Sequence, residues 1–198
     1  RMSHLKLMKL LYLADREAVR SFGFPISGDW MVSMPHGPVL SMTLNLMDGD
    51  VESCPGGWEA WISDKENHEL SLRQPLNPED LDELAPAELE VLRSVWQQFG
   101  AMGKWEIRDW THDHCAEWED PRGSSNPIAF ERLARAVGFD AAAAMHPAWT
   151  AGELHVKQLI LKTPRLLLNF LKSASGIFDA QGKFSLKRLL LYPVRMIK

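Results

Sequence analysis

The longest regular pattern in this sequence is HLKLMKLLYLADREAVRSF, which runs from His4 to Phe22. At about 100° per residue, its apolar side chains gather on one side, as in an amphipathic helix that faces a core. These apolar residues are Leu7, Met8, Leu11, Ala14, Ala18, Val19 and Phe22. Four cations fall on the opposite side, which we expect to face solvent or a partner: Lys6, Lys9, Arg16 and Arg20.

Asp15 breaks this pattern, because its angle places a carboxylate on the apolar side of the predicted helix, roughly in line with His4. A buried carboxylate needs hydrogen-bond donors. Two structural roles are open. Backbone N–H groups or His4 satisfy Asp15, or Asp15 fixes the Gly37-Pro38-Val39 turn that follows later in the chain.

The charge of the chain is divided unequally along its length. Residues 1–150 hold 13 Lys and Arg against 24 Asp and Glu, and 13 − 24 = −11. Residues 151–198 hold 9 against 2, and 9 − 2 = +7, so that the sum is the overall −4. An acidic body with a basic tail is consistent with a tail that lies across the body or with an external anionic partner.

Length and composition predict a folded protein of the cytoplasm. The 198 residues are 45% hydrophobic and 24% charged, which is ordinary for a globular chain with one sizeable core. The start of the sequence has no secretory signal pattern, so the two cysteines, Cys54 and Cys115, are not expected to form a disulfide. No apolar run reaches the roughly 20 residues that span a bilayer.

The remaining patterns predict a mainly α fold with a small β element, of the α+β class. Predicted extended segments cover residues 30–34, 58–62 and 69–72, the last two as a small β-hairpin or as paired extended segments. Further helices are predicted over residues 39–47, 86–99, 105–119 and 128–137. Pro38 is expected in the first turn of the helix over 39–47, where a missing N–H costs nothing.

We find no catalytic pattern in the sequence. It contains no GxxxxGK[ST], GxGxxG or GxSxG motif. His112 and His114 invite a zinc hypothesis, but positions i and i+2 of a helix point apart and no second ligand pair exists. We therefore expect His112 to be hydrogen-bonded in the core, Cys115 not to be a nucleophile, and the protein to be no enzyme and to hold no metal or cofactor.

Eight tryptophans are many for this length. Most are expected in the core, but tryptophan is also enriched at the centres of protein interfaces. Trp58 and Trp61 lie in the least regular part of the sequence, so we predict them as anchors for a partner, together with the cations Lys6, Lys9 and Arg16.

Three parts of the sequence carry a family resemblance. The first is the spacing of Lys6-Leu7, Lys9-Leu10, Tyr12 and Asp15; the second is the Gly37-Pro38-Val39 turn; the third is Leu89 to Phe99 with Thr111-His112 and Trp118. Together they resemble the Panacea domain of prokaryotic and phage proteins, which include the SocA antitoxin and GepA-like proteins. The resemblance implies structural roles for the motif residues Tyr12, Asp15, Gly37, Pro38, His112 and Trp118. It also implies a helix before the Lys6-Leu7 pair, with which this sequence nearly begins.

The resemblance further implies what the chain does. It predicts a Panacea-like antitoxin domain over residues 1–148 that binds and neutralises a cognate toxin protein and hands it to an AAA+ protease. Residues 149–198, basic and rich in leucine, are predicted as a helical appendage outside the family pattern. The alternative is a regulator that binds nucleic acid through the basic residues 151–198, because phosphate binding needs only distributed Lys and Arg.

Overall fold

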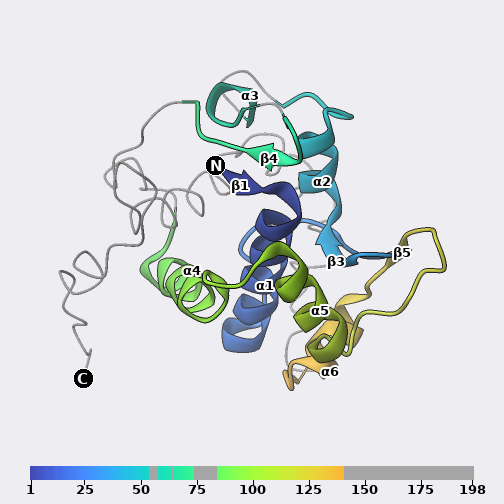
Figure 1. The fold of residues 1–198 in the computed structure, drawn as a ribbon. Coiled ribbons are helices and arrows are strands. Elements are labelled where there is room, and N and C mark those ends of the chain that lie inside the picture. The colour runs from blue at the N-terminus through green and yellow to red at the C-terminus, as the bar shows by residue number, and fades with distance from the viewer. Residues whose placement is uncertain (54–57, 64, 74–83, 141–198) are drawn as a thin grey trace.

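One helix lies at the centre of the fold. The computed structural model describes residues 1–53, 58–63, 65–73 and 84–140. Helix α1 (His4–Phe22) runs through the middle (Figure 1). Around it lie strand β3 (Gly37–Leu40) and the helices α2 (Ser41–Asp48), α4 (Pro86–Phe99) and α5 (Lys104–His114). Helix α1 ends at Gly23, whose φ of 84° is left-handed and whose N–H bonds to the carbonyl of Val19.

The predicted helix is confirmed, but its one-sided burial is wrong. Because α1 contacts elements on several sides, eleven of its residues are buried: Leu7, Met8, Lys9, Leu10, Leu11, Tyr12, Leu13, Ala14, Asp15, Ala18 and Val19. The run from Leu7 to Ala14 is apolar at nearly every position, which is typical of a helix buried all round. Lys9 lies inside this run and is 0% exposed, so the prediction that it faces solvent is wrong.

A small sheet stands beside α1. Strands β2 (Met31–Met34) and β3 (Gly37–Leu40) form a hairpin, and β5 (Asn126–Pro127) adds to the other edge of β2. In this register Pro38 faces Ser33 from an edge strand, where a missing N–H leaves no bond unmade. The predicted strand over 30–34 is thus confirmed. Pro38 is not in a first helical turn, since α2 begins only at Ser41 (Ser41–Asp48).

The second predicted pairing is confirmed in part. Trp58–Trp61 forms the short helix α3, but Ile62 and Leu72 meet in an antiparallel bridge. Two hydrogen bonds flank it, from the Ser63 N–H to the Ser71 carbonyl and from the Arg73 N–H to the Trp61 carbonyl. Strand β4 (Glu69–Leu70) instead pairs with β1 (Met2–Ser3) at the start of the chain. The stretch from Glu69 to Arg73 therefore pairs with a distant segment at its start and with the local one at its end.

Three more helices complete the described body. Helix α4 (Pro86–Phe99) has the predicted bounds, with Pro86 in its first turn and the Glu88 carboxylate accepting from the Ala85 N–H at 2.8 Å. Helix α5 (Lys104–His114) ends earlier than predicted, because the chain turns away at Cys115. Helix α6 (Phe130–Ala136) lies within its predicted range.

The α+β class is confirmed, because the described residues form mainly helices together with two small sheets. None of the described helices combines the length and the hydropathy needed to cross a bilayer. The predicted boundary at residue 148 and the predicted helical appendage over 149–198 lie outside the described residues.

Candidate partner-binding surface and the polar network beneath it

Lys9 binds the β2–β3 hairpin from inside the protein. Its Nζ donates to the carbonyl of Pro38 at 2.8 Å, inside the protein. Gly37 makes room for this contact. Its φ is +90°, and a Cβ there would lie 2.9 Å from Lys9 Nζ and 2.9 Å from Thr111 Oγ1. Burial lowers the pKa of Lys9 to about 7, because a desolvated ammonium is costly.

Trp118 binds the same hairpin at Met34. Its indole Nε1 donates to the carbonyl of Met34 at 3.0 Å, and its ring stacks on His112 with centroids 4.3 Å apart and an angle of 8° between the planes. The Nε2 atom of His112 has no hydrogen-bond partner among the described residues, so the ring is positioned by stacking. The predicted core hydrogen bond of His112 is not found at that atom.

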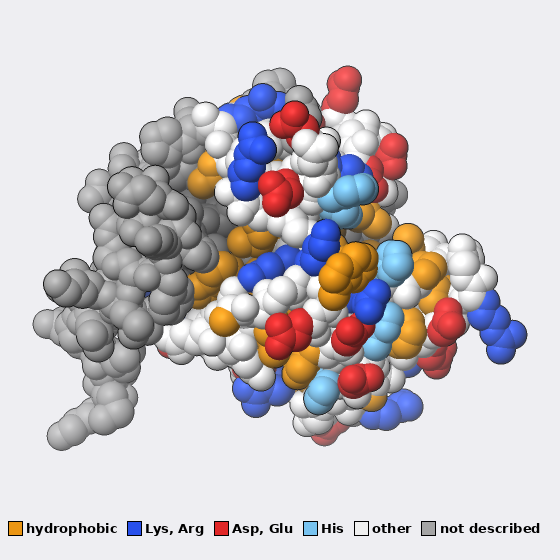
Figure 2. Space-filling model, viewed as in Figure 1, with side chains coloured by type: hydrophobic (Ala, Val, Ile, Leu, Met, Phe, Trp, Pro, Cys, Tyr) orange, Lys and Arg blue, Asp and Glu red, His pale blue; other side chains and the backbone are white. Residues whose placement is uncertain are grey.

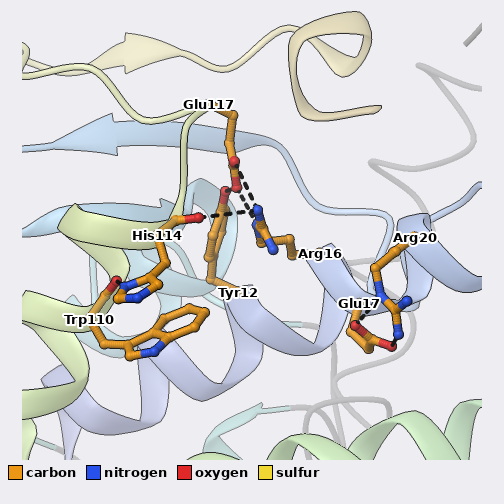
Figure 3. A network of polar contacts seen from close by, with 7 residues as sticks. All are labelled: Tyr12, Arg16, Glu17, Arg20, Trp110, His114 and Glu117. Carbon is orange, nitrogen blue, oxygen red and sulfur yellow. Dashed lines mark hydrogen bonds and ion pairs between the residues drawn. The ribbon is translucent and has the colours of Figure 1, made fainter. Parts of the chain in front are cut away.

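Glu117 joins the loop after α5 to the central helix. Although a carboxylate, it is 0% exposed, and it accepts from Tyr12 Oη at 2.5 Å and from Arg16 Nε at 2.7 Å (Figure 3). Arg16 also reaches the carbonyl of His114 at 3.4 Å. Burial, together with the charge of Glu117, raises the pKa of Tyr12 well above its ordinary value, so the phenol remains a donor. The sequence did not predict this role of Glu117, because buried glutamates are rare and its two partners, Tyr12 and Arg16, lie on another element.

Asp15 fixes the turn that follows α1, not the hairpin. It accepts from the backbone N–H of Ser27 at 2.9 Å and from the Ser27 hydroxyl. Of the two predicted roles, satisfaction by a backbone N–H is confirmed and the contact with the Gly37-Pro38-Val39 segment is wrong. His4 is not the partner, since its ring contacts the carbonyl of His68. Burial raises the pKa of Asp15 to about 7.

Cys115 lies in the same interior. The thiol is 1% exposed, and burial raises its pKa to about 12. A thiol in that state is a poor nucleophile at neutral pH. No group of three or more His, Cys, Asp or Glu residues that could hold a metal ion comes together in the described part of the chain. Cys54 lies outside it.

The motif residues thus converge on one unit in which α1, the hairpin and the segment around Trp118 are tied together. Residues 7–119, more than half of the chain, match the family model described as Antitoxin SocA-like, Panacea domain. The chain belongs to this family. The predicted resemblance is confirmed, and it suggests an antitoxin role, which is a non-catalytic one with a toxin as partner. No curated protein and no solved structure matched the chain.

In this Panacea domain the matched region contains the whole network from Lys9 to Trp118 and ends before α6. The sequence identified Tyr12, Gly37, Pro38, His112 and Trp118 as motif residues, and each of them takes part in the contacts around α1 and the hairpin. Asp15 stands apart from this group, at Ser27. The motif therefore describes how the domain is held together.

The domain carries a shallow hollow between α1, α4 and α5. Its volume is about 260 Å³, and its walls include Arg16, Arg20, Gln98 and Trp110. Arg16 is bound to Glu117 and Arg20 to Glu17, so both guanidinium groups are neutralised within the chain (Figure 3). The hollow is smaller than most small-molecule pockets.

The predicted tryptophan anchors are not exposed ones. Trp58 is 4% exposed in α3, and Trp61 is half-buried. Among the predicted cations, Lys6 is half-buried and donates to the carbonyl of Gly100 at 2.6 Å. The large exposed hydrophobic side chains of the described residues are others: Phe24 at 48%, Trp30 at 44% and Trp105 at 51%. Trp58 therefore offers little surface to a partner, whereas Trp61 keeps part of its surface exposed.

Proposed function

We propose that this chain is an antitoxin that binds a cognate toxin protein and neutralises it by direct contact. The observation that carries the proposal is the match of residues 7–119 to the SocA-like Panacea domain. Within the matched region, the contacts of Lys9, Glu117 and Trp118 join α1, the hairpin and the segment after α5. This unit offers a rigid scaffold for a partner.

The chemistry of the described residues agrees with a binding role. The groups that often carry catalysis are engaged in internal contacts: Lys9 with Pro38, Tyr12 and Arg16 with Glu117, and Asp15 with Ser27. Cys115 is held as a buried thiol. These side chains stabilise the domain and leave its surface to recognise a partner.

Charge supports a basic toxin as the partner. Residues 1–150 carry 13 Lys and Arg against 24 Asp and Glu, a net −11. Complementary charge steers association and raises its rate. In a second step of the same proposal, the captured toxin is presented to an AAA+ protease.

The alternative function, nucleic-acid binding through residues 151–198, rests on their net charge of +7. Those residues lie outside the described part of the chain. Binding of this kind weakens steeply with salt and is lost when residues 151–198 are deleted. Toxin binding through the body should survive that deletion.

The test is co-expression of the full chain with the product of the neighbouring reading frame in a bacterial host. We expect that product to stop growth alone, and to be tolerated and co-purified in equal amounts when the full chain is present. A neighbour that is harmless, or that stays toxic beside an abundant full chain, would contradict the proposal. Toxin half-life in strains with and without each AAA+ protease tests the second step.

A further inference from the structure

A mixed cationic and aromatic patch lies where α5 begins. Trp105 is 51% exposed, with Arg108 Cζ 4.8 Å and Lys104 Nζ 5.3 Å from its ring centroid. The exposed His36, from the tip of the hairpin, lies edge-on to the same ring at 6.4 Å. We name His36, Lys104, Trp105 and Arg108 the Trp105 patch.

The patch is positioned by the buried network described above. Lys9 and Trp118 hold the hairpin that carries His36, and Ile107, which is 0% exposed, anchors the first turns of α5. The Glu106 carboxylate accepts from the Gly103 N–H at 3.1 Å and so fixes the start of the helix. An exposed tryptophan on a rigid support loses little conformational entropy when a partner covers it.

The charge of the patch is opposite to that of the body around it. Arg108 is already bound to Asp109 at 2.5 Å, but Lys104 has no ion pair among the described residues. On the face drawn in Figure 2, Lys, Arg, His and hydrophobic side chains gather across the middle, with acidic side chains above and below. A partner carboxylate placed beside Trp105 would therefore find a free ammonium donor.

We infer that the Trp105 patch is the surface on which the toxin docks, and that the toxin presents an acidic segment to it. This inference rests on the proposed function. The aromatic ring supplies apolar area, Lys104 pairs with the acidic group, and His36 lies at the rim. Tryptophan and arginine are the residues that most often dominate binding energy at such surfaces.

The overall charge of residues 1–150 and the local charge of the Trp105 patch then have different roles. The net −11 of residues 1–150 attracts a protein that is basic overall. The cationic patch accepts only the acidic segment of that protein, because like charges that meet at an interface weaken binding. Together they fix the orientation in which the toxin binds.

A protein segment fits the patch better than single-stranded nucleic acid. Nucleic-acid strands bind by stacking bases on open aromatic faces, in grooves that are positively charged along the backbone. Here two cations lie over the Trp105 ring, and the acidic surroundings repel a phosphate backbone. A short acidic peptide segment needs only the patch itself.

The experiment compares three variants of the full chain against the co-expressed neighbouring product, by titration calorimetry and growth rescue. Trp105→Ala removes the ring and Lys104→Glu reverses the free charge. Trp30→Ala is the matched control, because Trp30 is 44% exposed and lies at the other end of β2 from the hairpin tip. Circular dichroism melts check that every variant is folded.

We expect Trp105→Ala and Lys104→Glu to weaken binding by about 30-fold or more, and Trp30→Ala by less than about 3-fold. An acidic-to-lysine change in the toxin that restores binding to Lys104→Glu would identify the acidic segment. If the wild-type chain binds the toxin and both patch variants bind it equally well, this inference is wrong and the proposed function stands. If the wild-type chain binds nothing, both are wrong.

The same variants also test two other possible occupants of the patch. Salt-sensitive binding of fluorescent dT12 or U12 that is lost in Trp105→Ala, with toxin binding unchanged, would assign the patch to nucleic acid and overturn the inference. A dimer in light scattering that Trp105→Ala converts to monomer, again with toxin binding unchanged, would assign it to a second copy of this chain.

Discussion

The ammonium of Lys9 lies 2.8 Å from the carbonyl of Pro38, with no carboxylate beside it in the described structure. The contact joins the central helix to the hairpin that carries His36 and so supports the surface on which we place the partner. A lysine that is 0% exposed is unusual, since its charge is costly inside a protein. Here its hydrogen bond to Pro38 fixes the position of the hairpin on α1.

The first prediction concerns the protonation of Lys9. Its pKa falls from 10.5 in the unfolded chain to about 7 in the folded one, so the unfolded state binds more protons between these values. Lys9 therefore makes stability rise with pH across that window. We expect the stability of Lys9→Met, relative to wild type, to fall by about 1 to 2 kcal/mol between about pH 7 and about pH 9.

Urea unfolding at the two pH values measures this difference. Lys104→Met, at an exposed position, is the control and should show no such trend. The Cys115 thiol, with a pKa near 12 in the folded protein, is common to all the proteins compared, so its effect cancels. Parallel pH profiles for Lys9→Met and wild type would mean that Lys9 is already hydrated.

The second prediction tests the close approach at Gly37. Replacement by Ala adds a Cβ about 2.9 Å from both Lys9 Nζ and Thr111 Oγ1, at a φ of +90°. Strain of the left-handed backbone and overpacking should together cost about 2 to 5 kcal/mol in unfolding free energy. Gly49→Ala separates the two effects, since its φ is +76° and no atom lies within 4 Å of the added Cβ. It should cost only about 1 to 2 kcal/mol. Equal losses for the two variants would show that the hairpin has room to move.

The third prediction concerns the buried carboxylate of Glu117. Glu117→Ala leaves Arg16 and Tyr12 without their acceptor and should destabilise the protein by about 3 to 5 kcal/mol. Glu117→Gln keeps an acceptor for Tyr12 and should cost less.

Glu119→Gln is the control two residues further on. The ion pair of Glu119 with Arg132 is partly exposed, so its loss should cost at most about 1 kcal/mol. Thermal and urea unfolding would report these differences, and a small effect of Glu117→Ala would mean that water replaces the lost oxygen atoms.

Local patterns were sufficient for most of the helices but not for α3 or for the end of α5, and contacts between distant residues were not visible in them. Helix α4 has its predicted bounds because Pro86, Glu88 and the apolar spacing all act within a few residues. Pro38 was misplaced because the same residue suits a first helical turn and an edge strand, and only pairing with Ser33 decides between them. The run from Leu7 to Ala14 is apolar at nearly every position apart from Lys9, and from this one could have inferred that Lys9 is buried.

The polar partners of the site were the hardest part to predict. Glu117 is bound by residues about a hundred positions away, and nothing in its neighbourhood distinguishes it from the exposed Glu119. The family resemblance identified Tyr12 and Trp118 but not what they contact. Asp29 was also missed. Its carboxylate accepts from the N–H groups of Met42 and Thr43 and caps α2 from outside that helix.

The last prediction concerns Asp15, whose folded pKa of about 7 lies above its ordinary value of 3.8. A group with a raised pKa binds more protons in the folded state, so its contribution to stability is full below about pH 4 and is lost as pH rises through 7. Asp15→Asn keeps an acceptor for the Ser27 N–H and cannot ionise. We therefore expect the stability of Asp15→Asn, relative to wild type, to improve by at least about 1 kcal/mol between about pH 5 and about pH 8.

Denaturation at several pH values from 5 to 8 measures the trend, with the exposed Asp109→Asn as a control that should show none. Asp29 contributes in the same direction, because burial also raises its pKa, but it is present in every protein compared. A constant difference between Asp15→Asn and wild type would show that the Ser27 donors keep Asp15 ionised throughout. In that case the turn after α1 would be held by a charged hydrogen bond at every pH tested, and Asp15→Asn would be the less stable protein across the range.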